Sequence, residues 1–148
     1  MFIEGKDLVK KYGKGEATVY ALDHTDFSME KGEIVVILGP SGSGKSTLLN
    51  ILGGLDKVTE GSMMVDGVNL EKMSAKELEV YRRNKLGFIF QSYNLTPDLT
   101  VRENIEMTAE LVKEPLDVDT LMESLGLAKY EKHFPKELSG GQQQRTAI

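Results

Sequence analysis

The sequence predicts an α/β fold with a helical insert. A short β-branched run at residues 34–38 is followed by a Gly- and Ser-rich turn and then by an apolar helical pattern. This strand–turn–helix order is typical of a parallel strand that is covered on both faces. Strand patterns dominate the first ninety residues, whereas helix patterns dominate from Thr100 onward. The alternation therefore predicts an α/β core with a helical insert over roughly residues 92–137.

The first part of the chain reads as strands joined by turns. Residues 2–12 and 19–27 are strand candidates, and Gly13 and Gly15 mark the turn between them. Asp66-Gly67 is a strong hairpin signal between strands at residues 61–65 and 68–70. A helix is expected at residues 46–52, and residues 86–90 form a further apolar strand candidate.

Three capping signals predict the later helices. Ser74 with Glu77, and Thr100 with Glu103, are capping boxes in which the serine or threonine precedes the helix. The first helix should reach about residue 83, and the second should end before Pro115. A short helix is expected over residues 119–125, and Ser139 can cap a last helix that begins at Gly140.

Composition restricts the function classes. The chain has 148 residues, which fits one domain, and a formal charge of −5, which argues against a nucleic-acid binder. It contains no cysteine, so disulfides and thiolate chemistry are excluded, and this suits a cytoplasmic location. The longest apolar run, residues 34–38, is too short to span a bilayer. We therefore expect any membrane connection to go through a partner.

A phosphate-binding loop is the strongest chemical signal. Residues 39–46 match the pattern G-x-x-x-x-G-K-[ST], between a predicted strand and a predicted helix. The glycines let backbone N–H groups face phosphate oxygens, and the helix adds its positive N-terminal dipole. Lys45 supplies a charge for the β- and γ-phosphates, and the Ser46 hydroxyl is a hard ligand for Mg²⁺. A Gly/Ser linker is the alternative, but linkers do not join an apolar strand to a Leu-rich helix. The nucleotide-binding residues predicted from this loop are Gly39, Pro40, Ser41, Gly42, Ser43, Gly44, Lys45, Ser46 and Thr47.

Two further motifs give the loop a family context. Leu138-Ser139-Gly140-Gly141-Gln142-Gln143-Gln144-Arg145 resembles the signature motif of ATP-binding-cassette (ABC) ATPases, and Phe90-Gln91 resembles their Q-loop. The resemblance covers the whole chain and is greatest to the lipoprotein-release and macrolide-export type, through residues 87–95 and 99–105. It implies a P-loop NTPase (RecA-like) core with an N-terminal antiparallel β subdomain and a helical subdomain insert. The implied division is residues 1–91, 92–137 and 138–148.

The resemblance also implies roles for individual residues. ATP and Mg²⁺ are the implied cofactors. Tyr12 matches the aromatic residue that stacks on adenine, although an ordinary strand tyrosine is the alternative. Lys45 and Gln91 are the implied catalytic residues, with Ser46 and Gln91 as the metal ligands. In the family, the signature residues of one protomer contact the γ-phosphate held by a second protomer. Those residues here are Ser139, Gly140, Gly141 and Gln142.

The resemblance implies further features that these 148 residues do not include. In the family, a second apolar strand ending in Asp-Glu and a switch histidine follow the signature motif. We therefore expect a chain truncated after that motif, with the C-terminal part of the core missing and negligible ATP hydrolysis on its own.

Several functions fit these observations. The leading hypothesis is the ATP-binding subunit of an ABC transporter, which lies at the inner face of the cell membrane through a permease. Its expected partners are a second ATPase protomer in a head-to-tail dimer and that permease. A catalytically inactive nucleotide-binding fragment, a soluble non-transport ABC ATPase and a nucleotide kinase are the alternatives. A kinase would lack the Ser139-Gly140-Gly141-Gln142 motif.

Overall fold

The computed structural model describes all 148 residues as two compact units, Met1–Leu86 and Gly87–Ile148. The three-part division expected above, at residues 91 and 137, stays a prediction. None of the helices is both long enough and apolar enough to cross a bilayer.

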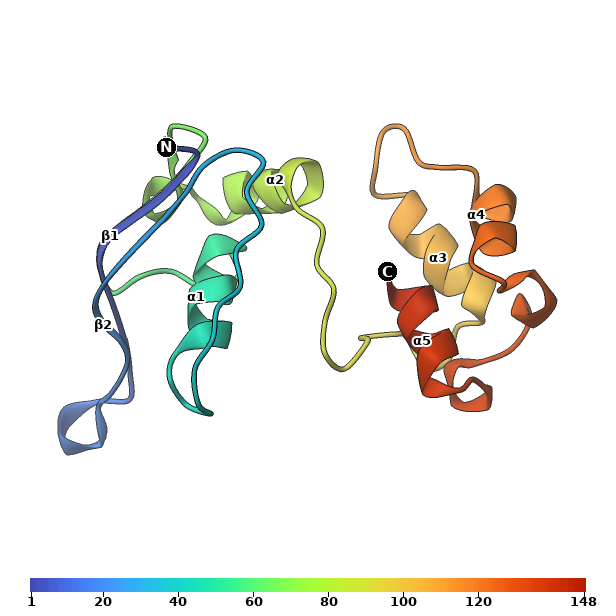
Figure 1. Ribbon diagram of the computed structural model, residues 1–148, viewed down its shortest axis with the longest axis horizontal. Helices are drawn as coiled ribbons and strands as arrows, with labels where there is room; N and C mark the ends of the chain where they lie inside the picture. The colour runs from blue at the N-terminus through green and yellow to red at the C-terminus, as the bar shows by residue number, and fades with distance from the viewer. The chain divides into compact units, whose positions relative to one another are not determined.

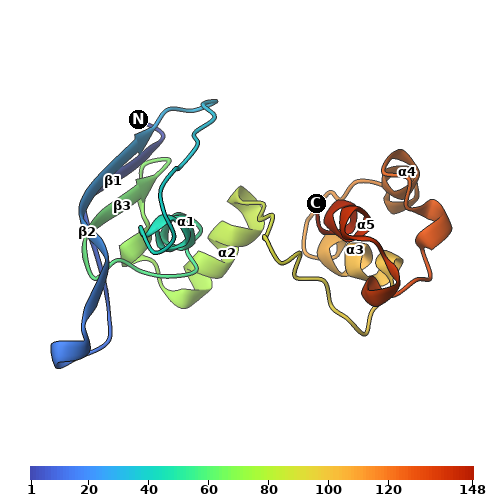
Figure 2. The same ribbon diagram turned by 60° about the horizontal axis from the view of Figure 1, so that its bottom comes forward.

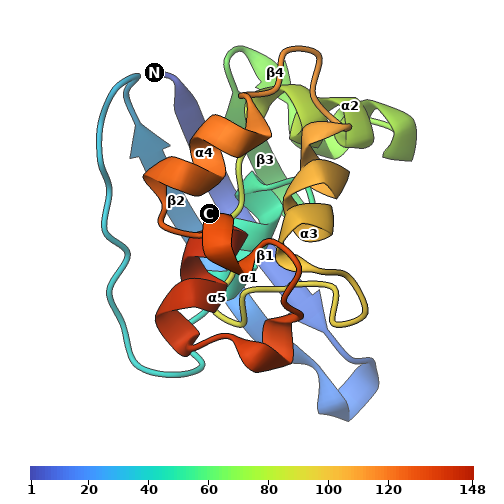
Figure 3. The same ribbon diagram turned by 90° about the vertical axis from the view of Figure 1, so that its right-hand side faces the viewer.

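A four-stranded antiparallel sheet forms one side of the first unit. Its strands are β1 (Ile3–Tyr12), β2 (Val19–Met29), β3 (Glu60–Val65) and β4 (Val68–Asn69), in the order β2-β1-β3-β4. The central strand β1 pairs with β2 on one edge and with β3 on the other (Figure 2). The short strand β4 lies beside β3 (Figure 3). All the strands predicted for these segments are confirmed.

The hairpin between β3 and β4 turns at the predicted dipeptide. Asp66 and Gly67 both adopt positive φ angles, 52° and 76°. Two successive left-handed residues are the requirement of a type I′ turn, which matches the twist of the flanking strands. The sequence signal and the backbone therefore agree at this turn.

Two helices pack on the sheet of the first unit. Helix α1 (Lys45–Leu52) and helix α2 (Ala75–Lys85) follow the predicted helical segments, and α1 lies against the sheet (Figure 1). Leu48 and Ile51 of α1 share a buried cluster with Leu8 of β1. The Tyr81 hydroxyl of α2 donates to the Leu52 carbonyl at 2.9 Å, which fixes α2 against the end of α1. The other buried members of the cluster are Leu22, Met63, Val65, Leu70, Leu78 and Tyr81.

Two predicted strands are wrong. Residues 34–38 and 86–90 have an irregular backbone and belong to no sheet. Ile34 and Leu38 are 95% and 85% exposed, and only Ile37 of this run packs against the core. A parallel strand needs a neighbour to satisfy its N–H and C=O groups, and no strand of the described chain lies beside either segment. An apolar composition shows that a segment can be buried, but it does not provide the neighbouring strand with which the segment would form hydrogen bonds.

The second unit is helical. Its helices are α3 (Val101–Ala109), α4 (Val118–Ser124) and α5 (Gly140–Ala147), and they enclose a separate core of Val101, Met122, Leu127 and Leu138 (Figure 1). The capping boxes predicted at Ser74 and Thr100 are present, and the predicted cap at Ser139 also forms a capping box, with Gln142. Asp117 caps α4, where its carboxylate accepts the Thr120 N–H at 2.8 Å. The helices predicted from Thr100 onward are therefore confirmed.

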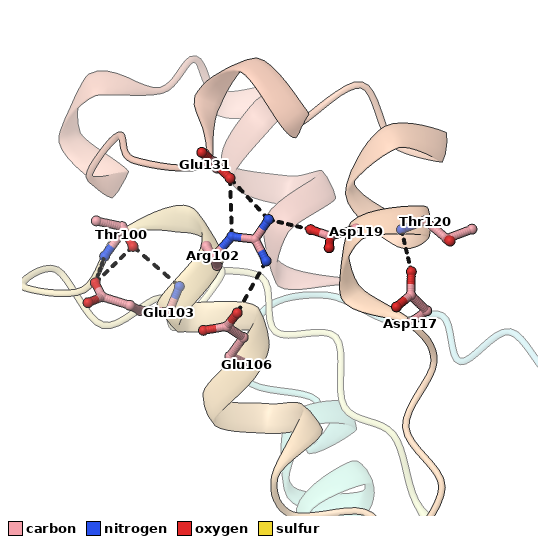
Figure 4. A network of polar contacts seen from close by, with 8 residues as sticks. All are labelled: Thr100, Arg102, Glu103, Glu106, Asp117, Asp119, Thr120 and Glu131. Carbon is pink, nitrogen blue, oxygen red and sulfur yellow. Dashed lines mark hydrogen bonds and ion pairs between the residues drawn. The ribbon is translucent and has the colours of Figure 1, made fainter.

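One arginine links three parts of the second unit. The Arg102 guanidinium donates to Glu131 at 3.0 and 3.2 Å and to Glu106 at 3.2 Å, and it also pairs with Asp119 (Figure 4). The backbone N–H of Arg102 donates to the Glu131 carbonyl at 3.1 Å. Helix α3, the start of α4 and the segment that leads to Ser139 are thereby held together.

Candidate nucleotide-binding site

The predicted phosphate loop starts at the end of the irregular segment 33–40 and continues into the first turn of helix α1. The Ser43 N–H donates to the Pro40 carbonyl at 3.3 Å, which closes a tight turn. The Lys45 ammonium reaches back across this turn and donates to the carbonyls of Gly39 and Pro40, at 2.9 and 3.0 Å. The loop is exposed, and Lys45 itself is half-buried. The side-chain cation is therefore held at the loop without a carboxylate partner, where an anion can reach it.

The first turn of α1 has no side-chain cap. Its N-cap residue is Gly44, and no side chain accepts from the first N–H groups of the helix. In contrast, α2, α3 and α5 each carry a complete capping box. Uncapped N–H groups with the positive end of the helix dipole form a binding site for an anion. The loop thus combines two anion-attracting features, the helix start and the Lys45 ammonium.

Two loop glycines meet different requirements. At Gly44, with φ 75°, a Cβ atom would lie 1.9 Å from the Ala21 carbonyl oxygen, so only glycine allows α1 to approach β2. At Gly42, with φ 82°, a Cβ atom would meet nothing within 4 Å. Gly44 therefore serves the packing of the unit, whereas the open space at Gly42 leaves the backbone accessible to a ligand.

Tyr12 lies near this loop in the same unit. Its ring is 43% exposed, and its hydroxyl donates to Asp56 at 2.7 Å. The hydrogen bond to Asp56 raises the pKa of the Tyr12 hydroxyl, while the Thr47 side chain acts on it in the opposite sense. An exposed aromatic side chain whose hydroxyl lies close to Thr47 of α1 fits a role at the base end of a nucleotide.

The remaining predicted site residues belong to the second unit. Gln91 is exposed in a turn where the Tyr93 N–H donates to the Phe90 carbonyl at 3.1 Å. A Cβ atom on Gly140 would lie 3.6 Å from the Tyr93 hydroxyl, so the loop after Gln91 lies beside the start of α5. The structure thus brings the Q-loop segment and the signature segment together.

The signature residues are occupied by the cap of their own helix. The Ser139 Oγ accepts the Gln142 N–H at 3.4 Å, and the Gln142 side-chain oxygen accepts the Ser139 N–H at 2.7 Å. Gly140 and Gly141 are exposed on the first turn. These bonds use only the acceptor oxygens of the two side chains, so the Ser139 O–H and the Gln142 side-chain NH₂ can still donate to a phosphate.

The predicted residues therefore form two groups. The loop and Tyr12 lie together in the first unit, and Gln91 lies with the signature residues in the second. No cluster of three or more His, Asp or Glu side chains is arranged to hold a metal. The donor set fits a Mg²⁺ ion that is bound mainly by phosphate oxygens and by the Ser46 hydroxyl, because Mg²⁺ keeps few protein ligands beside a nucleotide.

Two residues around Tyr12 were not predicted. Lys10 and Asp56 both contact Tyr12, Asp56 by the hydrogen bond above and Lys10 by a position 5.0 Å from the ring centre. Lys10 has a sequence signal, since residues two apart on a strand share a face. Asp56 has no such sequence signal, because it lies after α1, far from Tyr12 along the chain.

Similarity to known proteins bears on the whole chain. Residues 22–148 match the profile of the family described as "ABC transporter". The MG065 homolog of Mycoplasma pneumoniae is 45% identical over 149 residues, which is 99% of this chain and 32% of that protein. The macrolide export ATP-binding/permease protein MacB of Neisseria meningitidis is 46% identical over 99% of the chain and 23% of its own length. An uncharacterised ABC transporter ATP-binding protein of Thermotoga maritima is 46% identical over 96% of the chain and 63% of its own length. The chain thus spans less than two thirds of these relatives.

Solved structures give the same result for the fold. The dimeric structure of MJ0796, a bacterial ABC transporter cassette, superposes with a TM-score of 0.87 at 42% identity, over 99% of this chain and 67% of that one. A post-hydrolysis state of MJ0796 bound to ADP and Pi superposes with a TM-score of 0.86 at 40% identity, over 98% of this chain and 66% of that one. The expected α/β P-loop NTPase fold is confirmed.

Proposed function

The chain belongs to the ABC transporter family, and from that premise we propose that it is the ATP-binding part of a transporter. It couples the binding and hydrolysis of ATP to work by a membrane permease. The observation that carries this proposal is the uncapped start of α1 beside the Lys45 ammonium, in a loop of the predicted motif. Both features attract a polyphosphate.

The residues of the first unit contact different parts of the nucleotide. The N–H groups of residues 42–47 bind the phosphate oxygens, and Lys45 exchanges the carbonyls of Gly39 and Pro40 for the β- and γ-phosphates. The Ser46 hydroxyl is the Mg²⁺ ligand that this unit supplies, and Gln91 of the second unit is the proposed second ligand. When bound, Mg²⁺ neutralises charge on the phosphates and orients them. Tyr12 stacks on the base.

The second unit supplies a site for another protomer. Ser139, Gly140, Gly141 and Gln142 form an exposed helix start that suits the γ-phosphate held by a partner's loop. MJ0796 was solved as a dimer, and a head-to-tail dimer would bring each signature to the other loop. MacB unites an ATP-binding part and a permease in one protein by its name, which supports a permease partner here. The ATP-binding part would then lie at the cytoplasmic face of the membrane.

A complementation experiment tests the shared site. Lys45→Ala removes the loop cation and Ser139→Ala removes the signature hydroxyl, so each variant alone has two defective sites in a dimer. A mixed dimer has one intact site. We expect ATP with Mg²⁺ to dimerise the wild type and the mixture, but neither variant alone, in sedimentation velocity. ATP-dependent dimers of Lys45→Ala alone, at the wild-type ATP concentration, would refute the proposal.

A further inference from the structure

Lys10, Tyr12 and Asp56 form a hydrogen-bonded triad beside the phosphate loop. The Asp56 carboxylate accepts the Tyr12 hydroxyl at 2.7 Å on one oxygen and the Lys10 ammonium at 2.5 Å on the other. Lys10 also donates to the Lys57 carbonyl at 2.7 Å. The Lys10 side chain is only 12% exposed, so this ion pair is largely shielded from solvent. The triad fixes both ends of the Tyr12 side chain, its backbone in β1 and its hydroxyl on Asp56.

The triad also prepares one face of the ring. The Lys10 ammonium lies 5.0 Å from the Tyr12 ring centre, within the range of a cation–π contact. The ring is nevertheless 43% exposed. Lys10 thus covers part of an immobilised aromatic ring and leaves the rest open, which is the arrangement that a flat base requires for stacking.

Asp56 joins this ring to the helix that carries the loop. The N–H groups of Leu55 and Asp56 both donate to the Asn50 carbonyl of α1, at 2.8 and 3.2 Å. Leu8, two strand positions before Lys10, is fully buried against the same helix. The distance between the ring and the phosphate loop is therefore set by rigid contacts with α1 at both ends of the triad.

We propose that Asp56 and Lys10 are positioning residues that hold Tyr12 ready to stack on a nucleotide base while the α1 loop binds the phosphates. The inference rests on the proposed function of the loop. A ring that is already immobilised loses less conformational freedom when the base binds, so the triad increases affinity for a nucleotide without contacting it. Because stacking requires only a flat ring, the triad favours bases in general over phosphate chains that have no base.

The protonation states support this role at neutral pH. Partial burial raises the pKa of Asp56, but the hydrogen bonds from Lys10 and Tyr12 outweigh it, and the net pKa lies below its ordinary value. The hydrogen bond to Asp56 raises the pKa of the Tyr12 hydroxyl. Asp56 therefore remains an acceptor and Tyr12 a donor throughout the neutral range.

The chain contains a matched control pair. Lys11 lies 5.1 Å from the ring centre of Tyr20, its partner across the hairpin, and pairs with Glu60 at 2.5 Å. This pair shares no hydrogen bond or ion pair with Lys10, Tyr12 or Asp56. Tyr20→Phe removes a tyrosine hydroxyl, as Tyr12→Phe does, from a similarly exposed side chain. It should leave the Kd of ATP and of tripolyphosphate unchanged.

The test compares a nucleotide with a phosphate chain that has no base. Isothermal titration calorimetry would measure the Kd of Mg²⁺-ATP and of tripolyphosphate for the wild type, Asp56→Ala, Tyr12→Phe, Lys10→Met, Tyr20→Phe and Lys45→Ala. We expect Asp56→Ala to raise the Kd of ATP about three- to tenfold, since the ring can still stack on the base but is no longer held in place. The Kd of tripolyphosphate should change less than about twofold, because its contacts lie at the loop.

Each outcome has a clear meaning. Equal loss of affinity for both probes in Asp56→Ala, or no loss for either, would overturn the positioning role. If Asp56→Ala does not fold, Tyr12→Phe decides the question, since it keeps the ring and the Lys10–Asp56 pair and should show the same loss for ATP alone. Wild-type affinity of Lys45→Ala for both probes would instead reject the phosphate site, and with it this inference.

Discussion

The first turns of α1 and α5 carry two motifs of the same proposed site, yet they are built in opposite ways. The α1 turn begins at Gly44 and has no side-chain cap. The α5 turn begins at Ser139 and has a complete capping box with Gln142. An N-cap contributes about 1 kcal/mol, so α1 forgoes a common source of stability that α5 has.

The first turn of α1 leaves its N–H groups without a side-chain acceptor, so a ligand can bind them, whereas the first turn of α5 has a complete cap without a ligand. At α1, the N–H groups are open and the nearest cation, Lys45, is held only by the backbone carbonyls of Gly39 and Pro40. At α5, the Ser139 hydroxyl is already an acceptor for Gln142, although at 3.4 Å this bond is long. We infer that the α1 loop binds phosphate first. The α5 turn then contacts a phosphate only when a second protomer presents the one bound to its own loop.

The largest effect is expected at the glycine that replaces a cap in α1. Gly44→Ala would place a Cβ atom 1.9 Å from the Ala21 carbonyl oxygen in a backbone with φ 75°. Left-handed strain and the forced separation of α1 from β2 should together lower the free energy of unfolding by about 4 kcal/mol. Urea denaturation followed by circular dichroism measures the change. Gly42→Ala, with φ 82° and no contact within 4 Å, is the control and should cost about 1 kcal/mol.

The next largest effect concerns binding rather than folding. Lys45→Ala removes the only side-chain cation that the structure places at the loop, and it should raise the Kd of Mg²⁺-ATP about thirty- to a hundredfold. Its unfolding midpoint should remain close to that of the wild type, because the lost partners are exposed backbone carbonyls. Calorimetric titration and thermal melts of the same preparations check both parts. A large fall in the midpoint would mean that Lys45 acts as a structural residue.

A smaller effect should distinguish the two first turns directly. Ser139→Ala removes the cap of α5 and should lower the free energy of unfolding by about 1 kcal/mol. Ser43→Ala, which precedes the uncapped α1, should cost less than half as much, since its hydroxyl caps no helix. Equal losses in urea denaturation would contradict the contrast between the two turns.

The smallest effect is a pH dependence of a capped helix. The backbone N–H and hydroxyl of Thr100 donate to Glu103 at 2.7 and 2.8 Å, and these bonds lower the pKa of Glu103 from its ordinary value of 4.5. A lowered pKa means that the cap stabilises α3 above pH 4.5, and that this contribution is lost as the pH falls through the folded-state value. Thermal melts between pH 7 and pH 3 should show a shallower decline for Glu103→Gln than for the wild type. Glu123→Gln serves as the control, because Glu123 caps no helix, and it should follow the wild type.

Sequence reasoning predicted the features that depend on neighbours along the chain. The Asp66-Gly67 turn, the capping boxes at Ser74 and Thr100, the cap at Ser139 and the loop motif all follow from residues within a few positions of one another. It failed for residues 34–38 and 86–90, because a strand depends on a distant partner. Asp56 was not predicted for the same reason, since it reaches Tyr12 from 44 positions away in the sequence.

One titration tests the central claim most directly. Backbone amide NMR spectra recorded as Mg²⁺-ATP is added would report the uncapped and the capped turn in one experiment. We expect the largest shifts at the amides of residues 42–47, with smaller shifts at Tyr12 and little change at Ser139 and Gly140 while the protein is monomeric. Shifts centred on the α5 turn, with the α1 loop unchanged, would contradict it.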